Sequence, residues 1–305
     1  MFLVVLELRK RKVYAAVGRR GDLMSWFILS GFADEIAPDL KTQIEVLNRL
    51  DIHWLEMRGV NGKNVSDYTP EEMREIGKQL GSGGIRVSSI GSPIGKINIC
   101  DGFDEHFEKF KNTVELAKVL ETEYIRIFSF FMPEGEKPEK YRDEVLGRMS
   151  RFVKYAERMG ITLLHENEKG IYGDTAPRCL DILESIGSER LRAVFDPANF
   201  VQCGQKTYPE AYEMLKPYIS YMHVKDSKKD GEVVPSGMGD GCVREIYKAL
   251  ARDGYCGFAS LEPHLTNFVG FSELEASGHL ESLPEGGEKC FTAAAEAIRK
   301  IIAEL

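Results

Sequence analysis

The stretch ITLLHENEKGIYGDTAPRCLDILESIGSERLRAVFDPANF (161–200) carries one complete unit of the predicted fold. Its two apolar runs, residues 161–166 and 191–195, are short, as is typical of strands buried on both faces of a parallel sheet. Between them, residues 175–186 show the apolar spacing of an amphipathic helix. A strand, a helix and a second strand in this order predict a parallel crossover unit.

The same alternation runs through most of the chain. Further predicted strands are 26–33, 52–57, 85–91, 124–131, 218–225 and 257–262, and further helices are 105–120, 141–159, 242–252 and 291–305. Eight strands, each followed by a helix, predict an α/β fold, a single (β/α)8 TIM barrel. The alternative is an open doubly wound sheet, which normally has a Gly-rich phosphate turn after its first strand. Here that strand runs into Phe32-Ala33-Asp34-Glu35.

The domain boundaries follow from length and charge. The chain has 305 residues, which fits one barrel of about 250 residues with additions. Residues 1–23 differ from the rest, because an apolar run (2–6) precedes two basic runs, the reverse of the order in a secretory signal. We expect residues 1–23 to be a basic N-terminal extension outside the fold, with a membrane-surface anchor as the alternative. Residues 24–305 then form the barrel, with a long loop at 263–290.

Composition limits the partners of the protein. Lys and Arg number 40 against 48 Asp and Glu, so a face basic enough for nucleic acid is not expected. No apolar run approaches the roughly 20 residues that span a membrane. The six cysteines form no C-x-x-C pair, which favours reduced thiols and a cytoplasmic location. We expect a small-molecule partner, no nucleic acid and no membrane, and a homo-oligomer remains open.

Polar side chains that could bind a metal recur at the C-terminal ends of the last four predicted strands. They are Glu166, Asp196, His223 and Glu262. In a (β/α)8 barrel these positions are neighbours on the rim that carries the active site, so we expect them to converge. Three carboxylates this close would repel one another unless a cation lay between them. A set rich in carboxylates suits a divalent metal ion, Mn²⁺ or Mg²⁺, with Co²⁺ or Zn²⁺ as alternatives.

At this point the sequence resembles a known family. The chain is similar, over about residues 27–265, to the sugar phosphate isomerase/epimerase superfamily, the xylose isomerase-like TIM barrels. The runs that carry the resemblance are LLHENEKGIYGDT (163–175), FDPANF (195–200), YMHVKD (221–226) and SLEPH (260–264).

The resemblance implies a function and assigns roles. Glu166, Asp196, His223 and Glu262 would bind the metal, and Glu166 and Glu262 would also be the catalytic acid and base. The expected activity is that of a metal-dependent sugar or sugar phosphate isomerase or epimerase. Such an enzyme moves a proton α to a carbonyl through an enediolate.

Four further residues are candidates for substrate binding. Glu168 and Asn199 stand where many members of the family have histidine. Lys225 and His264 each lie two residues after a metal-ligand candidate, so they should face the same side, although Lys225 could instead pair with an acid. The glycines of 237–241 offer either a phosphate cradle at a helix N-terminus or a simple turn.

Charged residues at the other strand ends allow two interpretations. Asp34, Glu35, Glu56 and Arg58 could contact substrate or be surface charges, and Arg126 is expected to pair with a carboxylate inside the barrel.

Other functions fit the same residues. The second hypothesis is a metal-dependent lyase or dehydratase acting on a keto-sugar or keto-inositol, as in inosose dehydratases and C-glycoside deglycosylases. A related zinc nuclease, endonuclease IV, is disfavoured by the six histidines and the acidic balance. A sugar-binding barrel without catalysis is the last alternative.

Overall fold

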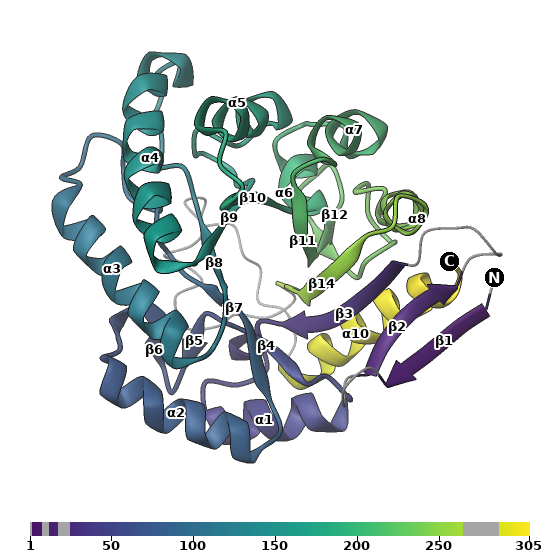
Figure 1. Cartoon of the computed structure of the whole chain (residues 1–305). Coiled ribbons are helices and arrows are strands. Elements are labelled where there is room, and N and C mark those ends of the chain that lie inside the picture. Colours follow the sequence, from purple (N-terminus) through teal and green to yellow (C-terminus); the bar gives the residue numbers. More distant parts are fainter. Residues whose placement is uncertain (1, 8–11, 18–24, 265–286) are drawn as a thin grey trace.

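The computed structural model describes residues 2–7, 12–17, 25–264 and 287–305. Eight parallel strands form a nearly closed barrel with helices around it, which confirms the predicted (β/α)8 TIM barrel (Figure 1). Each strand overlaps one of the eight predicted runs. They are β3 (Ser25–Gly31), β4 (Trp54–Met57), β7 (Arg86–Gly91), β8 (Tyr124–Ile127), β9 (Thr162–Glu166), β10 (Leu191–Phe195), β11 (Ile219–Val224) and β14 (Cys256–Leu261).

Hydrogen-bonded neighbours run in the order β3-β14-β11-β10-β9-β8-β7-β4, and all of these pairs are parallel. The first and second barrel strands, β3 and β4, pack side by side. Among the described residues no ladder of hydrogen bonds joins them. The barrel is therefore closed by packing at this seam and by hydrogen bonds elsewhere.

Two strands precede the barrel. The hairpin of β1 (Phe2–Glu7) and β2 (Lys12–Val17) is antiparallel, and β2 also pairs with the start of β3, antiparallel to it. β2 thus uses the hydrogen-bonding edge of β3 on the side away from β14. The expectation that residues 1–23 lie outside the folding unit stays a prediction.

Helices follow the barrel strands and form the outer layer (Figure 1). Helical stretches predicted from the sequence are found within a few residues of their expected bounds. The α-helices among the described residues are α1 (Leu40–Arg49), α2 (Pro70–Ser82), α3 (Asp104–Val119), α4 (Arg142–Met159), α5 (Ala176–Ile186), α6 (Pro197–Gln202), α7 (Tyr212–Leu215), α8 (Val243–Arg252) and α10 (Gly287–Ala303).

Local sequence explains where the helices begin and end. Thr69 and Glu72 form a reciprocal capping box at the start of α2, which satisfies backbone N–H groups that the helix leaves unpaired. Helices α4 and α5 end at Gly160 and Gly187, which have φ values of 73° and 60°. Glycine adopts this left-handed conformation without the steric cost of a Cβ atom.

The last helix begins earlier than the sequence suggested. Residues 287–290, expected to close a long loop, are the first turn of α10, and residues 265–286 of that predicted loop lie outside the described residues. Phe291 and Ile298 of α10 are fully buried. The helix lies between α8 and α1 and completes the outer layer beside β3 (Figure 1).

Alternation along each strand separates two cores. Leu163 of β9 and Met222 of β11 face outward and join the large hydrophobic cluster beneath the helices. Leu164 and Tyr221, one residue away on the same strands, face inward and pack inside the barrel. Because side chains alternate along a strand, this register also fixes which of the later polar residues point into the barrel.

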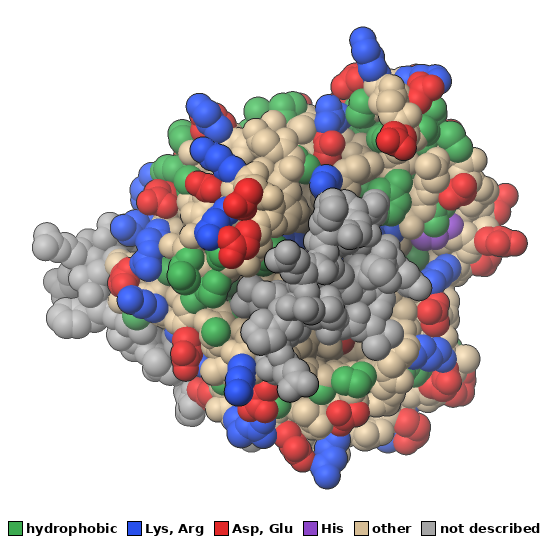
Figure 2. Space-filling model, turned by 180° about the vertical axis from the view of Figure 1, so that it is seen from behind, with side chains coloured by type: hydrophobic (Ala, Val, Ile, Leu, Met, Phe, Trp, Pro, Cys, Tyr) green, Lys and Arg blue, Asp and Glu red, His purple; other side chains and the backbone are tan. Residues whose placement is uncertain are grey.

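The outer surface is mixed in charge. On the face shown in Figure 2, Lys and Arg side chains are interspersed with Asp and Glu around the residues drawn in grey. Among the described residues, no helix has both the length and the apolar character needed to cross a membrane. The expectations about nucleic acid and oligomeric state stay predictions.

Candidate metal and active site

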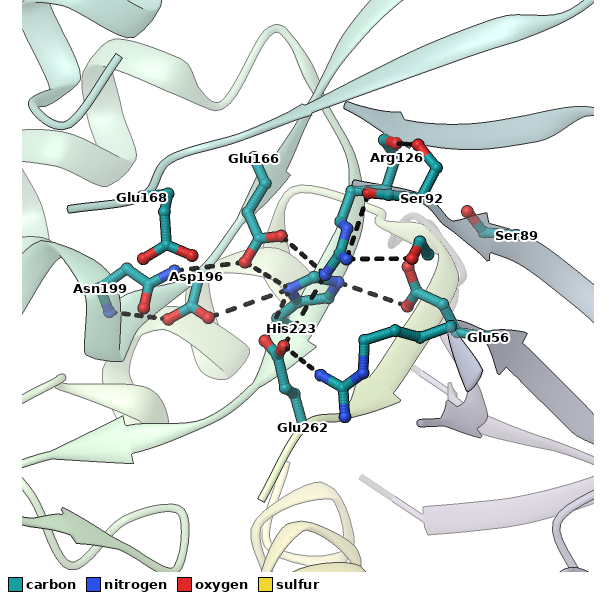
Figure 3. A network of polar contacts seen from close by, with 12 residues as sticks. Glu56, Ser89, Ser92, Arg126, Glu166, Glu168, Asp196, Asn199, His223 and Glu262 are labelled. Carbon is teal, nitrogen blue, oxygen red and sulfur yellow. Dashed lines mark hydrogen bonds and ion pairs between the residues drawn. The ribbon is translucent and has the colours of Figure 1, made fainter. Parts of the chain in front are cut away.

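The four predicted metal ligands converge inside the barrel (Figure 3). Glu166 ends β9, Asp196 follows β10, His223 lies in β11, and Glu262 follows β14. All four side chains are buried. One ligand atom from each of them can be chosen so that all four atoms lie within 4.8 Å of one another.

The inward register explains this convergence. Glu166 is two residues beyond Leu164, and His223 is two residues beyond Tyr221, so both share the inward face of their strands. His165, between Leu164 and Glu166, points away and lies against Gly173, as its place in the alternation predicts. The donor residues thus stand directly above the apolar interior of the barrel.

His223 turns one ring nitrogen toward the three acids. Its Nδ1 lies 3.0 Å from Glu166 Oε1, 3.2 Å from Glu262 Oε2 and 3.9 Å from Asp196 Oδ2. The other ring nitrogen, Nε2, faces away from this group, toward Glu56 on β4 at 3.3 Å. The imidazole therefore offers Nδ1 to a metal ion.

The Asp196 side chain both caps a helix and faces the site. Its Oδ1 accepts a hydrogen bond from the Asn199 backbone N–H at 2.8 Å and caps α6, while its Oδ2 faces the site. The Asn199 side chain then donates to Glu166 Oε1 at 3.2 Å. The strand-to-helix turn after β10 thereby connects two of the four candidate ligands.

Arginine side chains bind the outer oxygens of the two glutamates. Arg126 Nη1 lies 3.1 Å from Glu166 Oε2 and 3.7 Å from Glu262 Oε1, which confirms the expected pairing of Arg126 with a carboxylate. Arg58 Nη1 lies 3.2 Å from Glu262 Oε1. Both guanidinium groups also stack near the Phe32 ring, at 4.4 Å for Arg58 and 5.0 Å for Arg126. Each glutamate thus has one oxygen toward His223 and one toward an arginine.

Neighbouring charges keep both glutamates ionised. Burial by itself would raise the pKa of Glu166, but His223 and Arg126 outweigh it and lower that pKa to about 2. Burial acts in the same sense on Glu262, and Lys225 and His223 hold its pKa well below the usual range. Both carboxylates can therefore act as proton acceptors.

The other two candidate ligands respond differently. Burial raises the pKa of Asp196 to about 7 despite the nearby Lys225. For His223, burial opposes the charged form, but Glu166 and Glu56 outweigh it and raise the pKa well above its usual range. A cation that replaces the shared protons would relieve this competition, because metal ligands bind in their deprotonated forms.

The donor set fits a divalent ion. Asp196 Oδ2 and Glu262 Oε2, the oxygens that face His223 Nδ1, are buried and accept no hydrogen bond of regular geometry from any residue that the structure describes. Seven carboxylates of the described cluster face only four Lys and Arg side chains: Asp34, Glu35, Glu56, Glu166, Glu168, Asp196 and Glu262 against Arg58, Lys96, Arg126 and Lys225. This excess of carboxylates over Lys and Arg is costly to keep ionised in a largely buried site without a further cation, and oxygen donors with one imidazole suit a divalent metal.

A second group of metal-type ligand atoms adjoins the first. Glu35, Glu262 and His264 also bring one ligand atom each within 4.8 Å of the others. Arg58 contacts the same acids, with Nη2 at 3.0 Å from Glu35 and Nη1 at 3.2 Å from Glu262. The guanidinium already supplies positive charge at this second group.

The candidate substrate-binding residues surround the four candidate ligands. Lys225 Nζ lies 3.2 Å from Asp196 Oδ2 and 3.5 Å from Glu262 Oε2, and its neighbour Asp226 does not hold it. His264 Nε2 is 3.2 Å from Glu262 Oε1. Glu168 pairs with Lys96 at 2.9 Å and is partly exposed. Their roles in binding substrate stay predictions.

The backbone amides of the glycine loop (residues 237–241) after β11 already bind a side chain of the protein. Asp226 accepts hydrogen bonds from the backbone N–H groups of Gly237 and Gly239 through Oδ2 and of Gly241 through Oδ1, at 2.8, 3.0 and 2.9 Å. A Cβ atom on Gly239 would lie 2.4 Å from Asp226 Oδ1, so glycine is needed there. These amides bind an internal carboxylate, and the alternative of a phosphate cradle is not supported.

Four charged residues at the ends of the first two barrel strands lie in the interior. The sequence left Asp34, Glu35, Glu56 and Arg58 between substrate contact and surface charge. The side chains of Glu35, Glu56 and Arg58 are buried, and that of Asp34 is 7% exposed. Their position at the ends of the first two strands was the available signal, since it is the rule that located the four candidate ligands.

Comparison with known proteins identifies the family of the chain. The family model for xylose isomerase-like TIM barrels matches residues 44–303. The chain belongs to this family. Comparison with curated protein sequences finds no significant match.

Solved structures of other proteins resemble this xylose isomerase-like TIM barrel in fold. The probable 3-DHS dehydratase AsbF from Bacillus anthracis has a TM-score of 0.68 at 18% identity, covering 89% of this chain and 98% of that one. A D-allulose 3-epimerase from Methylomonas sp. has a TM-score of 0.70 at 13% identity, covering 92% and 99%. A xylose isomerase-like TIM barrel protein from Mycobacterium smegmatis in complex with magnesium has 0.67 at 15%, covering 92% and 97%.

Proposed function

We propose that this protein is a divalent-metal-dependent isomerase or epimerase of a sugar or sugar phosphate. The observation that carries the proposal is that Glu166 and Glu262 approach His223 Nδ1 from different strands, at 3.0 and 3.2 Å, one above and one below the ring in Figure 3. Two bases on opposite sides of a bound substrate can remove a proton from one face of a carbon and return one to the other.

Glu166, Asp196, His223 and Glu262 would hold the metal ion. When bound, a divalent ion would polarise the substrate carbonyl and make the neighbouring C–H bond more acidic. A similar structure determined with magnesium supports such an ion, and the similar D-allulose 3-epimerase supports the reaction class. Mn²⁺ and Mg²⁺ remain the expected ions.

The protein's own residues would move the proton and stabilise charge. In this proposal Glu166 or Glu262 accepts the proton α to the carbonyl, and the other glutamate returns it. Arg126 contacts both carboxylates and Arg58 contacts Glu262, and these contacts orient the two side chains. Lys225, next to Asp196 and Glu262, would face the developing enediolate and offset its charge.

The remaining candidates would position the substrate. Asn199 orients Glu166 through its hydrogen bond to Oε1. His264 contacts the outer oxygen of Glu262, and Glu168 with Lys96 would hydrogen-bond sugar hydroxyl groups. These contacts suit a polyhydroxylated substrate.

One feature favours a lyase as the second candidate. Elimination needs an acid that protonates the leaving hydroxyl group, and the Lys96–Glu168 pair places a proton donor beside the site at 2.9 Å from its acceptor. The likeness to the probable 3-DHS dehydratase AsbF supports this alternative.

An assay in D₂O separates the two reactions. Protein loaded with Mn²⁺ is incubated with ketoses, ketose phosphates and keto-inositols, and products are followed by NMR. Epimerisation gives deuterium at the epimerised carbon with the mass otherwise retained, whereas elimination gives a product that has lost water.

Glutamate substitutions test the mechanism. Glu166→Gln and Glu262→Gln, assayed at saturating metal, should each lower turnover by about 10²- to 10⁴-fold because a proton acceptor is lost. Glu184→Gln, the same change at an exposed site on α5, should keep wild-type turnover. Full turnover by either active-site variant would refute the two-base assignment, and a wild type without exchange or elimination would refute the proposed function.

A further inference from the structure

Glu56 is a buried acid that the proposed reaction does not use. It lies on β4, across the barrel from β11, and its side chain is fully buried. Its Oε2 lies 3.3 Å from His223 Nε2. Neither carboxylate oxygen accepts a hydrogen bond of regular geometry from the described residues. A buried carboxylate is costly unless it is paired, so the imidazole of His223 is its evident partner.

The strand around Glu56 is shaped to direct this side chain. The pairing of β4 with β7 shifts register between Leu55 and Glu56, so that Leu55 faces Val87 and Glu56 faces Ser89. Ser88 is left out of the ladder and donates its hydroxyl to the Leu55 carbonyl at 3.1 Å. Irregularities of this kind re-aim a side chain next to a site.

The two ring nitrogens of His223 face different partners. Nδ1 faces Glu166, Asp196 and Glu262, and Nε2 faces only Glu56 among the acids within 4 Å. An imidazole can offer a lone pair to a metal at one nitrogen while the other nitrogen donates its proton to an acceptor. A carboxylate in that position fixes the ring orientation and the tautomer.

We infer that Glu56 is a positioning residue: it holds the proton of His223 on Nε2 and keeps Nδ1 directed at Glu166, Asp196 and Glu262 for the metal. This inference rests on the metal site proposed above. Glu56 itself touches neither substrate nor metal, and its effect is on how tightly and in what geometry the ion is held.

The competing explanation is charge balance alone. Glu56 contacts His223, which also contacts the glutamates that Arg58 and Arg126 bind, and the charge of Glu56 could serve only to offset those arginines. Asp34 provides a matched control, because its side chain is only 7% exposed and pairs with Arg58 at 2.8 Å, and it is not among the described acids within 4 Å of the His223 ring nitrogens. Loss of charge at Asp34 changes the same cluster without changing the imidazole.

Metal titration separates the two explanations. Isothermal titration with Mn²⁺ should show affinity reduced by about 10- to 100-fold in Glu56→Ala and Glu56→Leu. Glu56→Gln keeps an acceptor oxygen and should lose less, while Asp34→Asn should bind as the wild type does. Equal losses in Glu56→Leu and Asp34→Asn would support charge balance and overturn the inference.

NMR of the wild type tests the proton directly and needs no variant of Glu56 to fold. In protein labelled with ¹⁵N-histidine and loaded with Zn²⁺, His223 should show a slowly exchanging Nε2–H signal, assigned by its absence in His223→Gln. A proton on Nδ1, or none on Nε2, would overturn the inference.

The outcomes also distinguish this inference from the proposed function. If the wild type binds neither Mn²⁺ nor Zn²⁺, the metal site and the inference both fail. If it binds the metal and Glu56→Leu binds it equally well, the inference fails while the metal site stands.

Discussion

The two halves of the barrel contribute different chemistry to one site. The second half, β9, β10, β11 and β14, supplies Glu166, Asp196, His223 and Glu262, whose ligand atoms converge. The first half, β3, β4, β7 and β8, supplies mainly the charges that surround them, such as Arg58, Arg126 and Glu56. The first half therefore acts as a frame that sets the charge and orientation of groups that the second half presents.

This division has a physical basis. Acids placed close together resist burial as anions, because each raises the cost of ionising the others. Guanidinium groups on the facing strands offset that cost without occupying the space between the donors. Arg126 sits between the Phe32 and Phe128 rings, at 5.0 and 4.8 Å, which holds its charge in one place.

Removing a cation from the frame should have the largest effect on stability. Arg126→Met leaves Glu166 Oε2 without its guanidinium in a buried site, which should cost about 3–5 kcal/mol of unfolding free energy in protein treated with chelator. Saturating Mn²⁺ should restore part of the loss, because it neutralises the same acids. Urea denaturation with and without metal measures both, and an unchanged midpoint would contradict the role of the first half as a frame.

Removing one acid from each half of the barrel should show which half binds the metal ion. Asp196→Ala removes a candidate ligand of the second half and should weaken Mn²⁺ binding by more than about 100-fold, beyond the effect expected of a residue outside the ligand set. Asp34→Ala changes an acid of the first half whose side chain is 7% exposed, and it should weaken Mn²⁺ binding far less. Comparable losses in calorimetric titrations would show that both halves bind the metal.

A charge pair outside the barrel should have the smallest effect. Arg142 on α4 contacts Asp181 on α5 at 2.6 Å, and hydrogen bonds from Arg142 lower the pKa of Asp181 despite partial burial. The pair is partly exposed, so Arg142→Met should cost less than about 1 kcal/mol.

The pH dependence of that small effect has a definite sign. Because the folded-state pKa of Asp181 lies below its ordinary value of 3.8, the stabilisation is complete above that value. It disappears as the pH falls through the lower, folded-state pKa. Thermal unfolding of wild type and Arg142→Met should therefore differ near neutrality and converge in strong acid; a difference that grows in acid would contradict this assignment.

Much of the second half could be predicted from the sequence. Glu166, Asp196, His223 and Glu262 each stand at the end of an apolar run, and the rule that such ends meet on one rim brought them together. Lys225 was predicted by its spacing from His223, and it lies against Asp196 and Glu262 as a neighbour of the cluster. The experiments proposed above test whether these residues bind metal and substrate.

The first half was harder to interpret for a physical reason. Glu56 and Arg58 follow the same strand-end rule, but an acid beside a base in sequence is equally compatible with an exposed surface. Burial distinguishes the two cases, and burial depends on which strands close the barrel. The occupied glycine loop is similar, since only the fold brings the amides of Gly237 and Gly239 to Asp226.

The sequence by itself determined the strand and helix pattern, the barrel, and the four side chains that meet at its rim, because these depend on local periodicity and on strand ends. The tertiary structure alone decided which oxygen of each glutamate faces His223 and which faces an arginine, and that Nε2 of His223 faces Glu56. Arg58 and Glu262 are 204 residues apart in the chain, and their contact exists only once the barrel has closed. Orientation of this kind follows from long-range packing, which local sequence patterns do not record.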